Sequence, residues 1–309
     1  MAYSNVSTGV GTTRTSGVSD RSLAVKVFSG EVLTAFESAN IFLGKVQNRT
    51  IASGKSASFA VIGKYAAAID THVPGTDITP NLINAGERVI EIDDLKYASV
   101  FVDSFEEAMQ HYETRSQYST EMGRRLSKTV DLAVIAQLDA CVAGAANAGD
   151  TNGAEGQPAA QTAISIGTIA AGAASGLKGD AILAALFDAD TAMEEDDIPG
   201  DRTVVMSPKN YNRLVQSGAV NKDMTTANGG LDSGTVTMVA GHKISVSNNV
   251  NTNDIYVFTQ NAVGVVKLLD IKSEVNYIPE KLGDLMTSTY AMGFGILNNG
   301  CVVKLSTDD

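Results

Sequence analysis

Residues 53–59 read SGKSASF, and Gly54-Lys55-Ser56 is how a nucleotide-binding P-loop ends. In such a loop another glycine precedes the Gly-Lys pair by five positions, and backbone N–H groups hold the phosphates. Arg49 occupies that position, where it cannot adopt a strained loop conformation as cheaply as glycine. The residues after Ser56 are strand-like and offer no helix start. The stretch therefore argues against an ATPase, and we expect a strand over residues 57–62.

An acidic run, Glu194-Glu195-Asp196-Asp197, lies at the end of a predicted helix, and its carboxylates are candidate ligands for a cation. Negative side chains at a helix carboxyl end are electrostatically unfavourable. We therefore expect solvent, a cation or a basic residue of a neighbouring chain to compensate them. The run lacks the alternating oxygen ligands and the glycine of a calcium loop, so it does not predict a metal site.

The other residues that could do chemistry are scattered. His72, His111 and His242 lie in different segments and share no metal-ligand spacing. Cys141 and Cys301 are the only cysteines, and their wide separation gives neither a disulfide framework nor a metal motif. No Ser, Cys or Thr lies in a nucleophile elbow. We therefore predict that the protein is not an enzyme, that it binds no cofactor and no metal, and that it resides in a reducing compartment.

The bulk composition is that of a globular protein. Of 309 residues, 44 % are hydrophobic and 19 % are charged, and the net charge is −12. Such an acidic chain is not expected to bind nucleic acid as a whole, because phosphate neutralisation needs clustered Lys and Arg. The first residues do not resemble a signal peptide, and no apolar run is long enough for a membrane span. We expect a soluble intracellular product.

The most extended predicted element is a helix of about 65 Å that runs from Ser104 to about Ala146. Ser104 and Glu107 form a capping-box signature, and apolar residues then recur every three or four positions. No proline interrupts the pattern, and Gly123 is its only weak breaker. We interpret the segment as a structural spine, with Gly123 as a candidate bend.

The segments before the spine have little core of their own. Residues 1–22 read as a flexible arm, and residues 23–42 read as a short strand followed by a helix from Gly30. Residues 50–102 read as an extended, strand-rich excursion that needs another surface to lie on. We therefore expect these parts to be buried against other copies of the chain. The candidate intersubunit contacts are Arg49, Lys55, Lys64 and the acidic run of residues 194–197.

The remaining residues predict a mixed α/β body. The expected elements are a helix over 181–197 with Ile182, Leu183, Leu186, Phe187 and Met193 facing inward, a buried strand over 203–206, a helix opened by Ser207-Pro208, strands over 236–246 and 255–258, and a strand-rich segment over 285–305 with Gly293, Gly295 and Gly300 as bends.

Six blocks of the sequence resemble the major capsid proteins of short-tailed, podovirus-type (Autographivirus-type) double-stranded DNA phages. The blocks lie in the family's order and are KVFSGEVLTAF (26–36), IASGKSASFAVIG (51–63), EAMQHYETRSQY (107–118), VMSPKNYNRLV (205–215), AVGVVKLL (262–269) and YAMGFGIL (290–297). The resemblance weakens in residues 145–180 and 217–260 and at residues 298–300, where the family more often has a basic residue, Pro and Glu.

This resemblance implies an α+β fold, the Hong Kong 97-type capsid fold. The implied parts are an N-terminal arm (1–49), an extended β-loop (50–102), a peripheral domain with the spine helix (103–146 and 271–309) and an axial domain (147–270). The implied function is a virion structural protein that self-assembles as hexamers and pentamers into the icosahedral head around double-stranded DNA, without sequence-specific binding.

The family also implies partners and a sequence of states. A scaffolding protein guides a procapsid that expands on maturation, a portal protein occupies one vertex, and a cement or decoration protein is an optional addition. Some relatives join a loop lysine covalently to an asparagine of a neighbouring subunit, for which Lys55 and Lys64 qualify by residue type only. The alternatives are an encapsulin-type nanocompartment shell, which has the same fold but holds enzyme cargo, and the ATPase.

Overall fold

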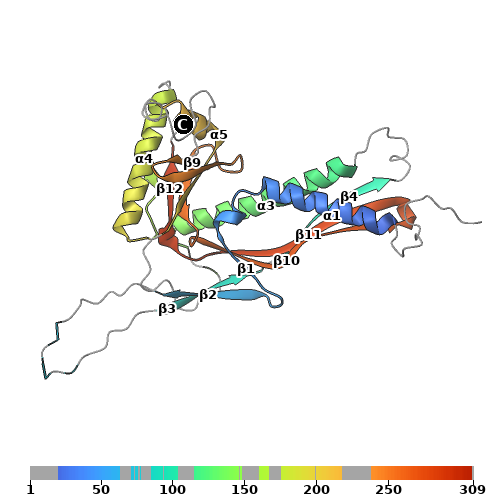
Figure 1. Ribbon diagram of the computed structural model, residues 1–309, viewed down its shortest axis with the longest axis horizontal. Coiled ribbons are helices and arrows are strands. Elements are labelled where there is room, and N and C mark those ends of the chain that lie inside the picture. The colour runs from blue at the N-terminus through green and yellow to red at the C-terminus, as the bar shows by residue number, and fades with distance from the viewer. Residues whose placement is uncertain are drawn as a thin grey trace, which may run out of the picture. The chain divides into compact units, whose positions relative to one another are not determined.

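The computed structural model describes residues 20–62, 71–72, 74–75, 77, 85–92, 94–103, 115–145, 147, 160–166, 175–198, 200–217 and 238–307. The chain forms two compact units (Figure 1). Unit 1 comprises residues 1–40, 93–130 and 268–292, and unit 2 comprises residues 41–92, 131–267 and 293–309. Within the described residues, no helix is long and apolar enough to cross a membrane.

The described residues contain both helices and strands, which confirms the α+β class. The helices are α1 (Asp20–Ala39), α3 (Arg115–Val142), α4 (Ser175–Glu195) and α5 (Pro208–Val215), with 3-10 turns at Leu43–Lys45, Pro279–Lys281 and Asn299–Cys301. The strands are β1 (Gln47–Thr50), β2 (Ser56–Ile62), β3 (Ala85–Glu91), β4 (Leu95–Asp103), β5 (Ile164–Ser165), β6 (Arg202–Met206), β7 (Met238–Val239), β8 (His242–Val246), β9 (Asp254–Thr259), β10 (Val263–Ile278), β11 (Gly283–Ile296) and β12 (Val302–Ser306).

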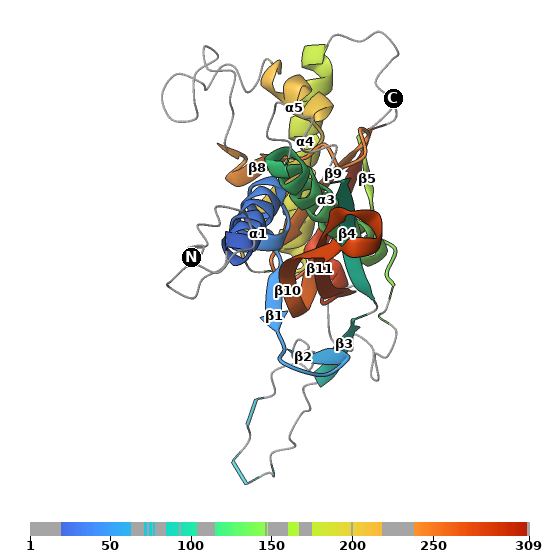
Figure 2. The same ribbon diagram turned by 90° about the vertical axis from the view of Figure 1, so that its right-hand side faces the viewer.

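Unit 1 is built from a sheet with two helices on one face (Figure 2). Its strands are hydrogen-bonded in the order β10-β11-β4, and β4 runs antiparallel to β11. The core joins Phe28 and Val32 of α1 to Met122 of α3, and it rests on alternate residues of the sheet, among them Val102 and Met286. Because strand side chains alternate between faces, the other residues of β4 face away from this core.

Small residues let α1 and α3 come close together. Ser119, Gly123 and Ser127 follow one another at four-residue spacing on α3, and all three are buried. A Cβ atom placed on Gly123 would lie 2.6 Å from the Val32 carbonyl oxygen and 2.8 Å from the Ala35 Cβ. Gly123 therefore lies at the closest part of a helix crossing, inside an uninterrupted helix.

The predicted start of the first helix is wrong. Residues from Asp20 are already helical, and the expected strand before Gly30 does not exist. The β-branched residues suggested a strand, but Phe28, Val32 and Phe36 recur at four-residue spacing and are all buried. Tertiary burial of this face thus outweighs the local strand preference.

The spine helix ends four residues earlier than predicted. Gly144 adopts φ +70°, the Gly144 N–H donates to the Cys141 carbonyl, and the Ala145 N–H donates to the Ala140 carbonyl. These bonds form a Schellman motif, which terminates the helix at Val142. The predicted capping box at Ser104 lies outside the described residues.

Unit 2 contains a six-stranded sheet in the order β5-β12-β9-β6-β8-β7. The strand β9 is buried along its whole length, as a central strand should be. The Phe258 ring on β9 stacks against Phe42, with ring centroids 6.2 Å apart. The predicted strands over 203–206 and 255–258 are confirmed as β6 and β9, whereas a turn at Ala240-Gly241 divides the predicted strand over 236–246 into β7 and β8.

The two helices of unit 2 agree with their predictions in part. Ser207 is the N-cap of α5 and accepts a hydrogen bond from the Asn210 N–H, with Pro208 in the first turn. In α4, Ile182, Leu186 and Met193 are buried as predicted, but the Phe187 side chain is 52 % exposed, so the inward placement of Phe187 is wrong. The helix also begins earlier than predicted, at Ser175.

Strand pairing divides the segment predicted as a single extended loop. β2 pairs antiparallel with β3, from Ser56 opposite Glu91 to Ile62 opposite Ala85. β4, in contrast, pairs with β11 in unit 1 because Val100 and Val102 pack on the core beneath α1. The four-part division of the chain at residues 50, 103, 147 and 271 remains a prediction, and the two compact units divide the chain at other positions.

Two glycines that were predicted to bend the last strands serve another purpose. Gly293 and Gly295 lie inside the uninterrupted strand β11. A Cβ atom on Gly293 would lie 2.4 Å from the Glu91 carbonyl oxygen, and one on Gly295 would lie 2.7 Å from the Ile90 Cγ1. These glycines therefore permit the close approach of neighbouring atoms, and the predicted bends at these two positions are wrong.

Candidate assembly surfaces

The SGKS stretch forms the base of the β2–β3 hairpin. Gly54 has φ +107°, a conformation that favours glycine and reverses the chain between β1 and β2. The Ile92 N–H donates to the Lys55 carbonyl at 2.8 Å, which closes the hairpin base. The predicted strand over residues 57–62 is confirmed as β2. The motif thus provides a turn and a strand start where a P-loop would provide a phosphate cradle.

The three basic candidates near this turn have different surroundings. Arg49 lies 5.6 Å from the Phe59 ring centroid, and its Nη1 donates to the Ser58 carbonyl, so it connects β1 to β2 within one chain. The Lys55 side chain is 77 % exposed and lies 3.8 Å from Glu91 in a solvent-screened pair. Lys64 lies outside the described residues. Contacts of these side chains with a neighbouring subunit remain predictions.

The acidic run at the end of α4 is partly compensated from within the chain. The Arg202 Nη1 contacts Asp190 and lies 3.4 Å from the Glu194 Oε1. The Gln161 side-chain amide donates to Asp196. Asp197 takes a left-handed conformation, φ 52°, at the helix terminus. Arg202 therefore supplies part of the compensation that the sequence suggested from solvent, a cation or a neighbouring chain.

A buried histidine completes this cluster. The His242 Nε2 lies 3.2 Å from Asp190, and the side chain is almost fully buried. Burial, and next the charge of Arg202, lower the pKa of His242, while Glu194 opposes them. The imidazole is therefore neutral at pH 7, and the cluster joins α4 to β6 and β8. In the described residues, no group of three His, Cys, Asp or Glu side chains has the geometry to hold a metal.

The outer face of the unit 1 sheet exposes large apolar side chains. Leu95, Tyr97 and Phe101 alternate along β4 and are 54 %, 72 % and 41 % exposed. Lys281 lies 6.0 Å from the Phe101 ring centroid. In the described residues β4 pairs with β11 alone, so its other side presents an open row of backbone N–H and C=O groups. An exposed apolar edge strand of this kind is an interaction surface.

Sequence reasoning did not single out this surface. The β4 sequence, LKYASVFVD, is apolar at both odd and even positions, so its period does not show which face is covered. Which face of β4 is covered depends on α1, and the start of α1 was itself predicted wrongly. The available signal was the polar Ser99 between Tyr97 and Phe101 at two-residue spacing, which suits a half-exposed strand face.

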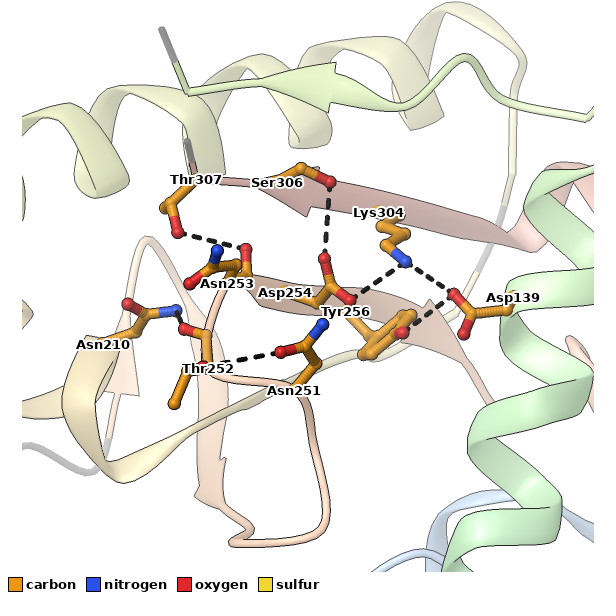
Figure 3. A network of polar contacts seen from close by, with 10 residues as sticks. All are labelled: Asp139, Asn210, Asn251, Thr252, Asn253, Asp254, Tyr256, Lys304, Ser306 and Thr307. Carbon is orange, nitrogen blue, oxygen red and sulfur yellow. Dashed lines mark hydrogen bonds and ion pairs between the residues drawn. The ribbon is translucent and has the colours of Figure 1, made fainter. Parts of the chain in front are cut away.

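A polar cluster fixes the carboxyl-terminal part of α3 to the unit 2 sheet (Figure 3). The Lys304 Nζ on β12 lies 2.8 Å from the Asp139 Oδ1 on α3 and 3.1 Å from the Asp254 Oδ2 on β9. The Tyr256 hydroxyl donates to the same Asp139 oxygen at 2.8 Å. One cation therefore pairs with two carboxylates from two elements, and no spacing in the sequence indicates that they meet.

A second buried ionic group lies beside the first residues of unit 2. Asp131 on α3 is fully buried and accepts hydrogen bonds from the Phe42 N–H at 3.4 Å and the Asn249 amide at 3.1 Å. Burial raises the pKa of Asp131 against these hydrogen bonds. The Lys45 Nζ is buried and has no hydrogen-bond partner among the described residues. Burial lowers the pKa of Lys45 to about 8, although Asp131 opposes this shift.

We expect the stability of the chain to rise between pH 8 and pH 10.5 because of Lys45. Over this range the folded chain loses the Lys45 proton while the unfolded chain still holds it, so the unfolded state binds more protons and the free energy of unfolding increases. Lys45→Met removes this group and should flatten that part of the profile. The measurement is urea unfolding of the unassembled chain at several pH values. A rise that persists unchanged in Lys45→Met would contradict the assignment to Lys45.

The fold and its exposed surfaces define the class of protein to which this chain belongs. The long helix α3, the β10-β11-β4 sheet, the β2–β3 hairpin and the six-stranded sheet of unit 2 are the parts of the Hong Kong 97-type capsid fold. The chain shares 33 % sequence identity with the capsid protein in the structure of cyanophage P-SCSP1u, with a TM-score of 0.73 over 97 % of each chain. The mature capsid of bacteriophage PhiM1 matches at 15 % identity and a TM-score of 0.69 over 87 % of each chain, which shows the shared fold.

The Gp10A-like major capsid protein family matches residues 58–306, and the chain belongs to this family. The major capsid protein of Enterobacteria phage T3 is 30 % identical over 310 residues, which cover 88 % of each chain. The predicted family and capsid function are thereby confirmed, and the location in the phage head follows from them. The encapsulin-type alternative is not favoured by these matches.

Proposed function

We propose that this chain assembles as hexamers and pentamers into the icosahedral head of a short-tailed phage, around double-stranded DNA. The observation that supports this most is the match of the capsid family over residues 58–306. We further propose that a scaffolding protein guides a procapsid, that the procapsid expands, and that a portal occupies one vertex. The chain performs no reaction of its own in this scheme, and its contribution is the geometry of its contacts.

The principal test is electron microscopy of the chain expressed alone and with its phage's scaffolding protein. We expect uniform closed shells with the scaffold, and irregular or fewer particles without it. Discrete monomers under both conditions would contradict a shell protein. Shells isolated from infected cells should contain the phage genome and a portal, whereas packaged enzyme cargo would favour a nanocompartment.

The β2–β3 hairpin and the β4 edge are proposed to meet between neighbouring subunits. In the described residues β2 and β3 pair only with each other, and a two-stranded hairpin alone is marginally stable. Ile62 near its end is 74 % exposed. The open side of β4, with Tyr97 and Phe101 beside it, offers both backbone partners and an apolar surface. Strand addition at an exposed edge would satisfy both surfaces at once.

We expect Tyr97→Thr to prevent shell formation while leaving the folded subunit intact. Tyr97 is 72 % exposed and threonine is a good strand former, so the free energy of unfolding should change by less than about 0.5 kcal/mol. Phe187→Ala removes an exposed aromatic residue from α4 and serves as the control. The yield of shells in sucrose gradients is the measurement. Normal shell yields from Tyr97→Thr would contradict a contact at β4.

A further inference from the structure

One exposed face of α3 in unit 1 carries three cations within five positions. Arg124, Arg125 and Lys128 are exposed, and we call these residues the helix cation face. The Arg125 Nε lies 2.8 Å from the Glu121 Oε1 on the same helix. Arg124 and Lys128 form no hydrogen bond or ion pair with the residues that the structure describes. Two of the three charges are therefore available to a partner.

This concentration of positive charge is unusual for the chain, whose net charge is −12. The carboxylates of the neighbouring helix only partly offset it. Glu31 on α1 already accepts a hydrogen bond from Ser119, and Glu37 is exposed. Solvation of an acidic protein does not account for three cations and only one carboxylate on a single helical face. Binding of an anionic partner to this face would account for them.

The uncharged residues of the same helical segment indicate the class of that partner. Ser116, Gln117, Thr120 and Thr129 are polar, and the apolar residues Met122, Leu126 and Val130 are buried. A protein–protein interface has a core of several apolar and aromatic side chains. In the unit 1 part of α3, Tyr118 is the one large apolar side chain that is exposed, at 36 %, and a tyrosine hydroxyl can itself donate to a phosphate. Phosphate contacts depend on charge and polar groups alone, and they carry no sequence information.

The opposite side of unit 1 has the opposite character. The alternate residues Leu95, Tyr97 and Phe101 expose apolar surface on the side of the sheet that α1 and α3 do not cover. A shell subunit has one broad face toward its contents and one away from them. If the apolar sheet face receives the hairpin of a neighbouring subunit, the helix side remains for contact with the contents.

We propose that the helix cation face binds the phosphate backbone of the packaged duplex DNA. This inference rests on the proposed function, in which the shell encloses double-stranded DNA. Arg124 and Lys128 are four residues apart, so they lie about 5–6 Å apart on the helix surface and can contact successive phosphates of one strand. The contacts are independent of sequence, as packaging of a whole genome requires. They act locally and leave the acidic remainder of the chain clear of the DNA.

Salt dependence of duplex binding tests the proposal. The unassembled full-length chain is titrated with a fluorescent 30-base-pair duplex between 50 and 200 mM salt. Two phosphate contacts predict a slope of log K against log salt of about −1.8, equivalent to an affinity loss of about 12-fold over this range. Arg124→Gln with Lys128→Gln removes both contacts and should bring the slope close to zero.

The control variant carries the same charge change at two exposed lysines elsewhere, Lys209→Gln with Lys243→Gln. We expect this variant to keep the wild-type slope. Equal slopes for the wild type and both variants would overturn the proposal, and so would equal reductions in the two variants. Binding of a polyglutamate peptide in place of the duplex would overturn it in favour of an acidic protein partner.

Electron microscopy of the same preparations separates the two levels of inference. We expect both double variants to form shells with the scaffold, because none of the four residues lies on the sheet face proposed to receive the hairpin. Normal shells combined with an unchanged duplex slope would reject the DNA contact and leave the proposed function standing. Failure of the wild-type chain to form any shell would reject the proposed function instead.

Discussion

Replacing Lys304 by methionine is expected to lower the free energy of unfolding by about 2–3 kcal/mol at pH 7. Methionine retains most of the volume of the lysine stem but removes the only cation that the structure shows between Asp139 and Asp254 (Figure 3). The Asp254 side chain is 12 % exposed, so its charge is poorly solvated without a partner. Removal of one partner from a fully buried pair costs about 3–5 kcal/mol, and the 46 % exposure of Asp139 reduces this figure.

Lys272→Met provides the matched control for this prediction. The Lys272 Nζ lies 2.6 Å from the Glu274 Oε1, but both side chains are at least half exposed. Its loss should change the free energy of unfolding by less than about 1 kcal/mol. Urea unfolding of the unassembled chain measures both variants. Addition of Asp254→Asn to Lys304→Met should recover part of the loss, and equal effects of Lys304→Met and Lys272→Met would refute the role of burial.

The sequence predicted those elements whose signals are local. The Ser207-Pro208 pair fixed the start of α5, because a hydroxyl cap and a proline in the first turn need no tertiary partner. The run TVVM predicted β6 because its strand preference is also a local signal. The resemblance to podovirus-type capsid proteins supplied the fold, since it depends on long ordered blocks instead of individual propensities.

The sequence could not predict features that depend on distant residues. The start of α1 was hidden because Val25 and Val27 favour a strand locally, whereas the burial of Phe28 in the core of unit 1 favours the helix. The Lys304 cluster joins residues 139, 254 and 304, and neither spacing nor charge pattern connects them. The exposure of Phe187 likewise depends on which side of α4 the unit 2 sheet covers. In each case the deciding contact is formed by a segment far away in the chain.

Gly123→Ala is expected to destabilise the subunit by up to about 2 kcal/mol, although alanine favours a helix interior by about 1 kcal/mol. The added Cβ would lie 2.6 Å from the Val32 carbonyl oxygen, a backbone atom that a rotamer change cannot move. Overpacking of this kind costs about 1–3 kcal/mol, so α1 and α3 must separate. Gly30→Ala is the control, because a Cβ on Gly30 meets nothing within 4 Å and should stabilise the chain by about 0.5–1 kcal/mol.

The same substitution distinguishes two roles of Gly123 in the assembled shell. A glycine that serves only the helix crossing should lower subunit stability, and the shells that still form should expand at the wild-type rate. A glycine that also allows α3 to bend should slow expansion when alanine stiffens the helix. Time-resolved electron microscopy of purified procapsids after a trigger measures the rate. Wild-type kinetics in Gly123→Ala shells would reject the bend and leave the close contact with α1 as the reason for this glycine.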